Sequence, residues 1–212
     1  MDRSGQQPVT GADKNAINLR HKTRTAKHKQ VVDKRIAAAK VDKGLLLVIT
    51  GNGKGKSSSA FGMVARTLGY GLKAAVFQFI KGKEEVGERA YFVRDPNMRW
   101  ERCGEGFTWE TQDRDRDISA ARAGWEKAKE ALADPTVHLV VLDEQTYLVN
   151  YRYLSLEEIM PAIEARPAMQ HVVITGRAAH DVFVEAADTV SAIRDVKHAF
   201  RAGVKAQQGI DL

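Results

Sequence analysis

The sequence has 212 residues, of which 43% are hydrophobic and 28% are charged, values typical of one globular domain and not of a wholly disordered chain. Its longest strongly apolar run, residues 45–49, is far shorter than the roughly 18 to 20 residues that span a bilayer. Residues 1–30 are polar and contain no apolar signal segment, and the single cysteine, Cys103, excludes an internal disulfide and a cysteine-based metal cage. We therefore expect a soluble, cytoplasmic protein with no membrane partner.

The positive charge is concentrated at the amino-terminal end. The formal net charge is +6, and residues 1–43 hold eleven lysines and arginines against four aspartates, which leaves residues 44–212 nearly balanced. We therefore divide the chain into a basic arm, residues 1–43, and a body, residues 44–212. Val31, Val32 and Ile36 stand among good helix formers, which predicts a short amphipathic helix over residues 30–41 after a mobile start.

Three roles are open for the arm: a nucleic-acid tether, a cap over an anionic ligand, or a solvated tail. We interpret residues 1–20 as a solvated tail. Residues 20–43 are interpreted as a cap over an anionic substrate, because a phosphate-binding motif follows directly along the chain. No aromatic residue lies among the bases of the arm, and this absence disfavours binding of single-stranded nucleic acid.

In the body, short apolar runs alternate with helical patterns, which is typical of a parallel sheet with crossover helices. The predicted strands are residues 45–50, 74–79, 99–103, 139–143, 172–175 and 189–193. Most of them are too apolar to have a solvated face, so we expect burial on both sides. The predicted fold is α/β and P-loop NTPase-like, with a mostly parallel central sheet and helices on both faces.

Three helices are predicted between these strands. The first covers residues 60–68, and the second covers residues 118–134 after an acidic cluster whose charge favours a helix start. The third begins at a capping box made by Ser155 and Glu158 and ends before Pro167.

A glycine-rich loop follows the first predicted strand. It reads TGNGKGKS over residues 50–57 and departs from the phosphate-binding motif G-x-x-x-x-G-K-[ST] only at Thr50, which replaces the first glycine. The glycines let backbone amides point inward and the following helix adds its positive end, so we expect the loop to surround a polyphosphate. Lys56 is expected to reach phosphate oxygens, and Ser57 to bind a divalent cation. The expected nucleotide-binding residues are Gly51, Asn52, Gly53, Lys54, Gly55, Lys56 and Ser57.

Two adjacent acids, Asp143 and Glu144, end the apolar segment of residues 138–142. Open α/β sheets bind ligands at the carboxyl ends of their strands. We therefore expect one acid to contact the metal ion and the other to support it or to have a structural role; the alternative is that the pair merely caps the strand. Arg177, after another predicted strand, is either a phosphate contact or a surface ion-pair partner.

The expected site contains no general base. No catalytic histidine constellation, kinase H-R-D motif or cysteine pair accompanies the loop, so phosphoryl transfer is not positively supported. Lys54 and Lys56, together with a cation, would suit the departure of a whole triphosphate, whose negative charge they would stabilise. A P-loop ATPase or nucleotide kinase is the alternative enzyme, and a nucleotide-regulated nucleic-acid-binding protein is the alternative outside enzymology.

The sequence resembles the P-loop corrinoid adenosyltransferases, the ATP:cob(I)alamin adenosyltransferases of the cobalamin pathway. The resemblance runs from Gln30 to the carboxyl terminus, and a general P-loop protein would share only two of its six segments. These segments are TGNGKGKS (50–57), QFIKG (78–82), GFTWETQ (106–112), VVLDE (140–144), ITGR (174–177) and VKHAFRAGVKAQQGID (196–211).

This resemblance implies that a reduced corrinoid, either cob(I)alamin or a biosynthetic precursor, attacks the 5′ carbon of ATP and releases triphosphate. Lys54 and Lys56 are then the catalytic residues. The resemblance also implies Mg²⁺ or Mn²⁺ as the cation, a homodimer, and a flavoprotein reductase as electron donor. Phe107 and Trp109 would otherwise be interpreted as core residues; the resemblance implies that they press on the lower face of the corrinoid and displace its axial base.

Overall fold

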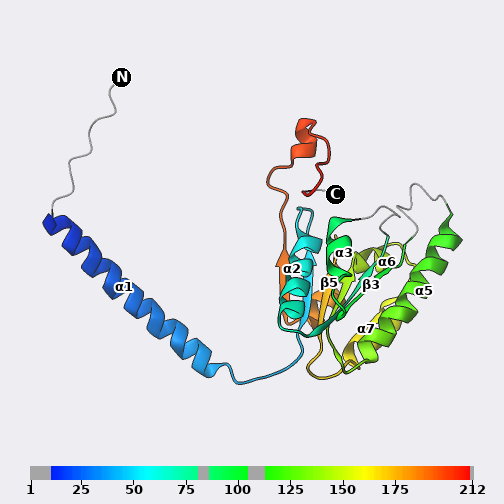
Figure 1. The fold of residues 1–212 in the computed structure, drawn as a ribbon, viewed down its shortest axis with the longest axis horizontal. Coiled ribbons are helices and arrows are strands. Elements are labelled where there is room, and N and C mark those ends of the chain that lie inside the picture. The colour runs from blue at the N-terminus through cyan, green and yellow to red at the C-terminus, as the bar shows by residue number, and fades with distance from the viewer. Residues whose placement is uncertain (1–10, 81–85, 105–112, 211–212) are drawn as a thin grey trace. The chain divides into compact units, whose positions relative to one another are not determined.

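The computed structural model describes residues 11–80, 86–104 and 113–210, which divide into two units that meet between Asp42 and Lys43. The second unit is built on a six-stranded sheet in the order β3-β2-β4-β5-β1-β6, with every neighbouring pair parallel (Figure 1). The strands are β1 (Leu46–Thr50), β2 (Lys73–Gln78), β3 (Met98–Arg102), β4 (Val137–Asp143), β5 (His171–Thr175) and β6 (Thr189–Ala192). The predicted α/β fold is confirmed, and each predicted strand lies within two residues of the observed bounds.

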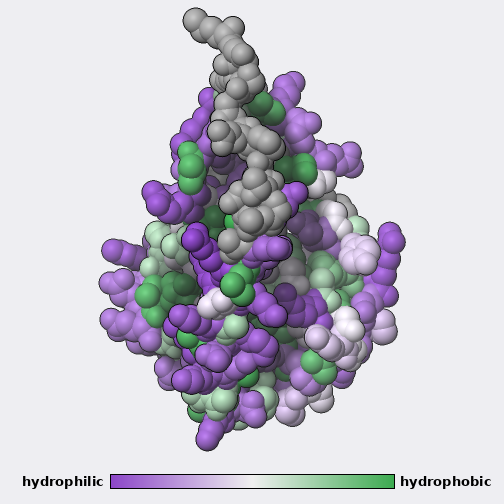
Figure 2. Space-filling view, turned by 90° about the vertical axis from the view of Figure 1, so that its left-hand side faces the viewer, coloured by the Kyte–Doolittle hydropathy of each residue, from purple (hydrophilic) through white to green (hydrophobic). Residues whose placement is uncertain are grey.

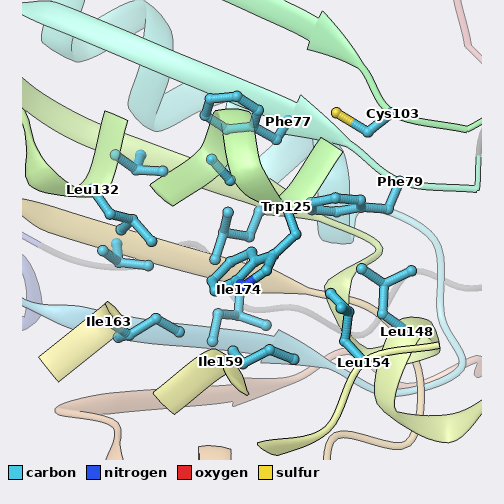
Figure 3. Close-up of a cluster of buried hydrophobic side chains, with 14 of the residues drawn as sticks. Phe77, Phe79, Cys103, Trp125, Leu132, Leu148, Leu154, Ile159, Ile163 and Ile174 are labelled. Atoms are coloured by element: carbon cyan, nitrogen blue, oxygen red, sulfur yellow. The ribbon is translucent and has the colours of Figure 1, made fainter. Parts of the chain in front are cut away.

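Helices cover both faces of the sheet. One face is covered by α2 (Lys56–Gly69) and α3 (Gly87–Phe92). The other is covered by α5 (Arg114–Ala133), α6 (Gln145–Asn150), α7 (Leu156–Glu164) and α8 (Asp181–Ala186). Successive strand residues alternate between two cores, so Val76 packs on the α2 side and Phe77 on the α5 side. On the α5 side, Trp125 points into the core near Ile174 of β5 (Figure 3).

The central strands are buried on both faces, as the sequence predicted. In β2, β4 and β5 every residue after the first one or two is buried. The two edge strands differ from this pattern. Only Trp100 of β3 is buried, and all four residues of β6, which pairs only with β1, are exposed.

Parallel strands place all their carboxyl ends at one edge of the sheet. The loops that follow β1, β2, β4 and β5 therefore meet there. Beyond β6 the chain continues past this edge through a short 3₁₀ helix, η1 (Ala199–Ala202) (Figure 1). This carboxyl-terminal segment, residues 193–210, lies in the same unit as the sheet.

The capping box predicted at the start of α7 is confirmed, whereas α2 and α5 begin at Lys56 and Arg114, each four residues before the predicted starts at residues 60 and 118. Ser155 Oγ accepts from the Glu158 backbone N–H at 3.3 Å, and Glu158 Oε2 accepts from the Ser155 N–H at 2.9 Å, which completes the capping box. At the start of α5, Asp113 Oδ1 accepts from the Arg116 N–H at 3.1 Å. The helices α3, α6 and α8 were not predicted, because six residues are too few to show a helical period.

The arm unit contains one long helix, α1 (Gly11–Ala38). The predicted helix over residues 30–41 was too short at its amino-terminal end. Lysine, arginine, alanine and glutamine are good helix formers, and Lys29 pairs with Asp33 one turn later at 2.8 Å. The described side chains of this helix are exposed, including Ile36 at 66%.

No helix in the described ranges combines the length and the apolar character needed to cross a membrane. Hydrophilic residues dominate the face drawn in Figure 2, and hydrophobic residues are scattered among them.

Candidate active site

The glycine-rich loop connects β1 to α2 at the carboxyl edge of the sheet. Gly55 precedes the first turn of α2 with a φ of 110°, a backbone conformation that residues with side chains rarely adopt. A Cβ on Gly51 would stand 2.4 Å from the Ile193 carbonyl oxygen, and one on Gly53 would stand 2.6 Å from the Arg194 carbonyl oxygen. These two glycines therefore let the loop pack backbone to backbone against the segment after β6.

Part of the loop is held by the protein itself. The Gly53 N–H donates to the Ile193 carbonyl at 2.8 Å, so this amide is directed at β6 and its continuation. Lys56 is 7% exposed, and its Nζ donates to the Gly53 carbonyl at 2.9 Å. The loop is thus braced by contacts within the protein, with the Lys56 ammonium group folded against it.

A cavity of about 550 Å³ opens at this loop. Five residues predicted for the site line it together: Lys54, Gly55, Lys56, Ser57 and Glu144. Helix α3 adds Tyr91 and Phe92 to the wall, and the carboxyl-terminal segment adds Ile210. An anion in this cavity would meet two ammonium groups, a hydroxyl and the amino-terminal end of α2, which is the environment a polyphosphate requires.

The two adjacent acids have different surroundings. Asp143 is fully buried; its Oδ1 accepts from Thr175 Oγ1 at 2.7 Å and its Oδ2 accepts from Gln78 Nε2 at 3.0 Å. Glu144 is half-buried, lines the cavity, and has left-handed backbone with φ 61° and ψ 23°. Sequence alone left open which acid faces the ligand, and the structure brings Glu144 into the cavity with Asp143 beneath it.

Arg177 lies in a loop that is held from two sides. Its carbonyl accepts from Thr146 Oγ1 at 2.7 Å and from Asn150 Nδ2 at 3.3 Å, both in α6. On the other side, the Ala179 N–H donates to Thr50 Oγ1 at 3.2 Å. Thr50, the departure from the phosphate-binding motif, therefore links the glycine-rich loop to the loop after β5, which a glycine could not do.

The Arg177 side chain is exposed and is not among the described residues that line the cavity. Burial and the Glu144 carboxylate raise the pKa of Tyr147, whereas Arg177 lowers it. Arg177 and Glu144 therefore lie within electrostatic range of the same phenol. A phosphate contact by Arg177 stays a prediction.

A second cavity, of about 520 Å³, lies under the carboxyl-terminal segment and shares Lys54 and Ile210 with the first. Its other lysine and arginine residues are Arg194, Lys197 and Lys205. Sequence reasoning did not assign these residues to the site. The signal that could have found them is the row of bases after the last strand, within a segment too polar to belong to the core.

The predicted corrinoid contacts, Phe107 and Trp109, lie outside the described residues. Cys103, at the end of β3, is buried among apolar side chains. Burial and the neighbouring Glu101 raise the pKa of its thiol to about 12, so the group stays protonated and is no nucleophile.

The comparisons with known proteins agree on one family. Residues 42–212 match the family described as ATP:corrinoid adenosyltransferase BtuR/CobO/CobP. A corrinoid adenosyltransferase of Pseudomonas aeruginosa is 56% identical over 193 residues, which cover 91% of this chain and 95% of the relative. The corrinoid adenosyltransferase CobA of Salmonella typhimurium is 50% identical over 192 residues, and a corrinoid adenosyltransferase of Escherichia coli K12 is 48% identical over the same length; both matches cover 91% of this chain and 97% of the relative. Since the match includes the glycine-rich loop, both acids and both cavities, the chain belongs to the ATP:corrinoid adenosyltransferase family.

Proposed function

We propose that the cavity at the glycine-rich loop is where this enzyme transfers the 5′-deoxyadenosyl group of ATP to the cobalt of a reduced corrinoid and releases triphosphate. Adenosyl transfer from ATP to a corrinoid is the activity of the family. The observation that carries the assignment to this cavity is the meeting of Lys54, Lys56, Ser57 and Glu144 in its walls.

The reaction forms a cobalt–carbon bond and breaks the bond between the 5′ carbon and the α-phosphate oxygen. The cobalt(I) centre of the corrinoid substrate supplies the electron pair, so the nucleophile carries no proton and no general base is needed. The departing oxygen keeps the pair of the broken bond, and negative charge grows on the triphosphate. We assign the stabilisation of that charge to Lys56 and Lys54.

A divalent cation, Mg²⁺ or Mn²⁺, fits this cavity. The Ser57 hydroxyl and the Glu144 carboxylate are hard oxygen ligands contributed by two different elements. Within the described residues, no group of three or more His, Cys, Asp or Glu side chains could hold a metal ion by itself. That suits an ion which takes its other ligands from phosphate and water. When bound, such an ion would neutralise part of the phosphate charge.

We assign Phe107 and Trp109 to the lower face of the corrinoid. A cobalt without an axial base is easier to reduce from Co(II), because the d orbital that accepts the electron is no longer raised by an axial donor. Phe107→Ala or Trp109→Ala is therefore expected to lower turnover strongly when a Co(II) corrinoid and a reductase are supplied, and much less with chemically prepared Co(I). Equal losses in the two assays would contradict this role.

The remaining assignments concern partners and the arm. We propose a homodimer that works in the cytoplasm with a flavoprotein reductase, as the resemblance to the family implies. For the arm, residues 20–43, we keep the role of a cap over the anionic substrate, which its surplus of lysine and arginine supports.

Product analysis tests the function. With ATP, Mg²⁺ and a chemically reduced corrinoid, the enzyme is expected to form triphosphate and a light-sensitive cobalt–carbon bond in equal amounts. Formation of ADP and orthophosphate in place of triphosphate would indicate an ATPase. Formation of ADP and a phosphorylated nucleotide, when a nucleotide acceptor is also supplied, would indicate a nucleotide kinase, and either result would reject the proposal. Salt-dependent DNA binding that is lost on deletion of residues 1–20 would favour the nucleic-acid-binding alternative.

A further inference from the structure

A buried hydrogen-bond chain joins four strands, from the middle of β3 to the carboxyl ends of β2, β4 and β5. Trp100 Nε1 of β3 donates to Gln78 Oε1 of β2 at 2.9 Å, and Gln78 Nε2 donates to Asp143 Oδ2 of β4 at 3.0 Å. From the other side, Thr175 Oγ1 of β5 donates to Asp143 Oδ1 at 2.7 Å. The Thr175 oxygen in turn accepts the Glu144 backbone N–H at 3.0 Å. The hydrogen-bond chain therefore ends at the backbone of Glu144, the acid that lines the cavity.

The direction of each bond follows from the chemistry of the groups. An indole N–H can only donate, so the amide oxygen of Gln78 faces Trp100 and its nitrogen faces Asp143. The backbone N–H of Glu144 can only donate, so the Thr175 oxygen accepts from it and the single hydroxyl proton of Thr175 points to Asp143. The lone pairs of Thr175 are then directed at the Glu144 N–H. The donors and acceptors of the hydrogen-bond chain therefore have one arrangement, in which Asp143 accepts from both Gln78 and Thr175.

Water does not compete with these bonds. Asp143 and Thr175 are 0% exposed, and Gln78 is 1% exposed. Hydrogen bonds to a charged acceptor are short and strong, and they gain strength where the local dielectric constant is low. A buried carboxylate without them would be strongly unfavourable. Asp143 is therefore held firmly beneath the cavity and is suited to supporting its neighbours.

Trp100, at the far end of the hydrogen-bond chain, contacts the helices that form walls of the cavity. The Trp100 ring lies 4.9 Å from the Phe61 ring of α2 and 6.2 Å from the Phe92 ring of α3, measured between centroids. Phe92 itself lines the cavity, and α2 is the helix that follows the glycine-rich loop. The hydrogen bonds that hold Asp143 are thus connected, through Trp100, to both α2 and α3.

Glu144 depends on this support. Its left-handed backbone is unfavourable for a residue with a long side chain, and such conformations persist only where the surroundings hold them. The bond from its N–H to Thr175 is a contact that holds the backbone in this conformation. Loss of the Thr175 hydroxyl would remove this contact and let the Glu144 carboxylate change its place in the wall of the cavity.

We propose that Thr175, Gln78 and Trp100 are positioning residues for adenosyl transfer, which hold Asp143 as a buried support and through it set the place of the Glu144 carboxylate beside the phosphate-binding loop. This inference rests on the proposed function of the cavity. It divides the work of the two adjacent acids: Asp143 acts from beneath, and Glu144 faces the ligand.

Two substitutions at one position separate the hydroxyl from the shape of the side chain. Thr175→Val keeps the volume of the side chain but removes the hydroxyl, whereas Thr175→Ser keeps the hydroxyl. Changing a residue that orients a metal ligand lowers metal affinity or activity by about 10- to 100-fold. We expect Thr175→Val to weaken Mn²⁺ binding to the enzyme–ATP complex by about ten-fold, measured by water proton relaxation, and to lower kcat more than it raises the KM for the corrinoid. Thr175→Ser is expected to restore both.

A variant at the other end of the hydrogen-bond chain keeps the test valid if Thr175→Val does not fold. Trp100→Phe retains an aromatic ring against Phe61 but removes the indole N–H, and it is expected to weaken Mn²⁺ binding in the same direction by a smaller factor. Thr189→Val makes the matched change on the exposed edge strand β6, at a residue that does not belong to the hydrogen-bond chain. It is expected to leave Mn²⁺ binding unchanged.

The outcomes distinguish this inference from the proposed function. Unaltered Mn²⁺ binding and kcat in Thr175→Val, or in Trp100→Phe where that variant alone folds, would overturn the positioning role. An equal loss in Thr175→Ser would also overturn it, because the hydroxyl would then not be the cause. Failure of the proposed function would show in the unsubstituted enzyme, which would release no triphosphate.

Discussion

The carboxyl and amino edges of the sheet are built in opposite ways. At the carboxyl edge, three residues other than glycine have left-handed backbone soon after a strand: Ile80 after β2, Glu144 after β4 and Ala178 after β5. Strained backbone of this kind persists where packing and hydrogen bonds hold it, and it clusters at functional sites. Among the described residues, no comparable strain in a residue other than glycine occurs directly before a strand.

The amino edge is instead closed by side chains that donate to backbone carbonyls. Gln170 Nε2 lies 3.0–3.1 Å from three carbonyl oxygens, those of Ala131, Asp134 and Val137. The Arg166 guanidinium donates to three more at 2.7–3.1 Å, those of Ile163, Gln170 and Gly44. The difference indicates that the amino edge contributes mainly stability, while the carboxyl edge contributes function and carries its strain.

The largest effect is expected from Lys56→Ala at the carboxyl edge. Loss of a group that stabilises charge in the transition state lowers kcat by about 10²- to 10³-fold. The folded state loses the hydrogen bond that Lys56 Nζ donates to the Gly53 carbonyl, and we expect the free energy of unfolding to fall by about 1.5–3 kcal/mol. Turnover with chemically reduced corrinoid and unfolding in urea measure the two effects. A variant that loses stability but keeps its kcat would reverse the assignment of the two edges.

Gln170→Leu makes the opposite test at the amino edge. The substitution keeps the approximate size of the side chain but removes the donor that these three carbonyl groups share, although those of Ala131 and Asp134 also accept a backbone N–H, from Asp134 and Val137. We expect the free energy of unfolding to fall by about 1–3 kcal/mol, with kcat per folded molecule unchanged. Gln30→Leu, at an exposed position of α1, is the control and should change stability by less than about 0.5 kcal/mol. A lower kcat in folded Gln170→Leu enzyme would show that the amino edge also serves the reaction.

Thr50→Gly sharpens the comparison within the loop, because it restores the glycine of the phosphate-binding motif. If the loop served phosphate alone, this change would be neutral. Because Thr50 Oγ1 accepts the Ala179 N–H, we expect a loss of about 1–2 kcal/mol from the missing bond and the added backbone freedom. Thr50→Ser, which keeps the hydroxyl, should recover most of it in the same urea experiment. A Thr50→Gly variant as stable as the unsubstituted chain would remove the proposed link between the two loops.

These contacts also mark the limit of what the sequence could predict. Strands such as β4 and caps such as Ser155 depend on residues close together in the chain, so local patterns indicate them. The approach of Gly51 to Ile193 depends on β6 lying beside β1, which no local pattern contains. The partners of Asp143 likewise follow from the strand order.

The choice between the two acids illustrates the same limit. Along a strand, side chains alternate between the two faces, so alternation would place Asp143 and Glu144 on opposite faces without saying which of them meets the ligand. The rule stops at the end of β4, because Glu144 has left-handed backbone and no longer continues the strand. The length of α1 was missed for a different reason: its high helix propensity carries no apolar period that would set its start.

The smallest effect is expected at Gln145, which departs from the rule that buried polar groups are bonded. It is 0% exposed, and neither its amide nitrogen nor its amide oxygen has a hydrogen-bond partner within the described structure. A buried polar group left unsatisfied destabilises a protein by about 1–3 kcal/mol. Gln145→Leu, which has a similar size and needs no partner, is therefore expected to raise the free energy of unfolding by about 1 kcal/mol.

Activity measured on the same Gln145→Leu variant decides what this buried amide means for the carboxyl edge. Gln145 directly follows Glu144. If its amide takes part in the reaction, the variant without the amide would be more stable but slower. Stability would then be exchanged for function, as it is in the strained backbone of Glu144. A variant that is more stable and equally fast would limit the functional strain of this edge to the backbone. A fall in stability would refute the expectation, because it would mean that the amide has a partner in solution.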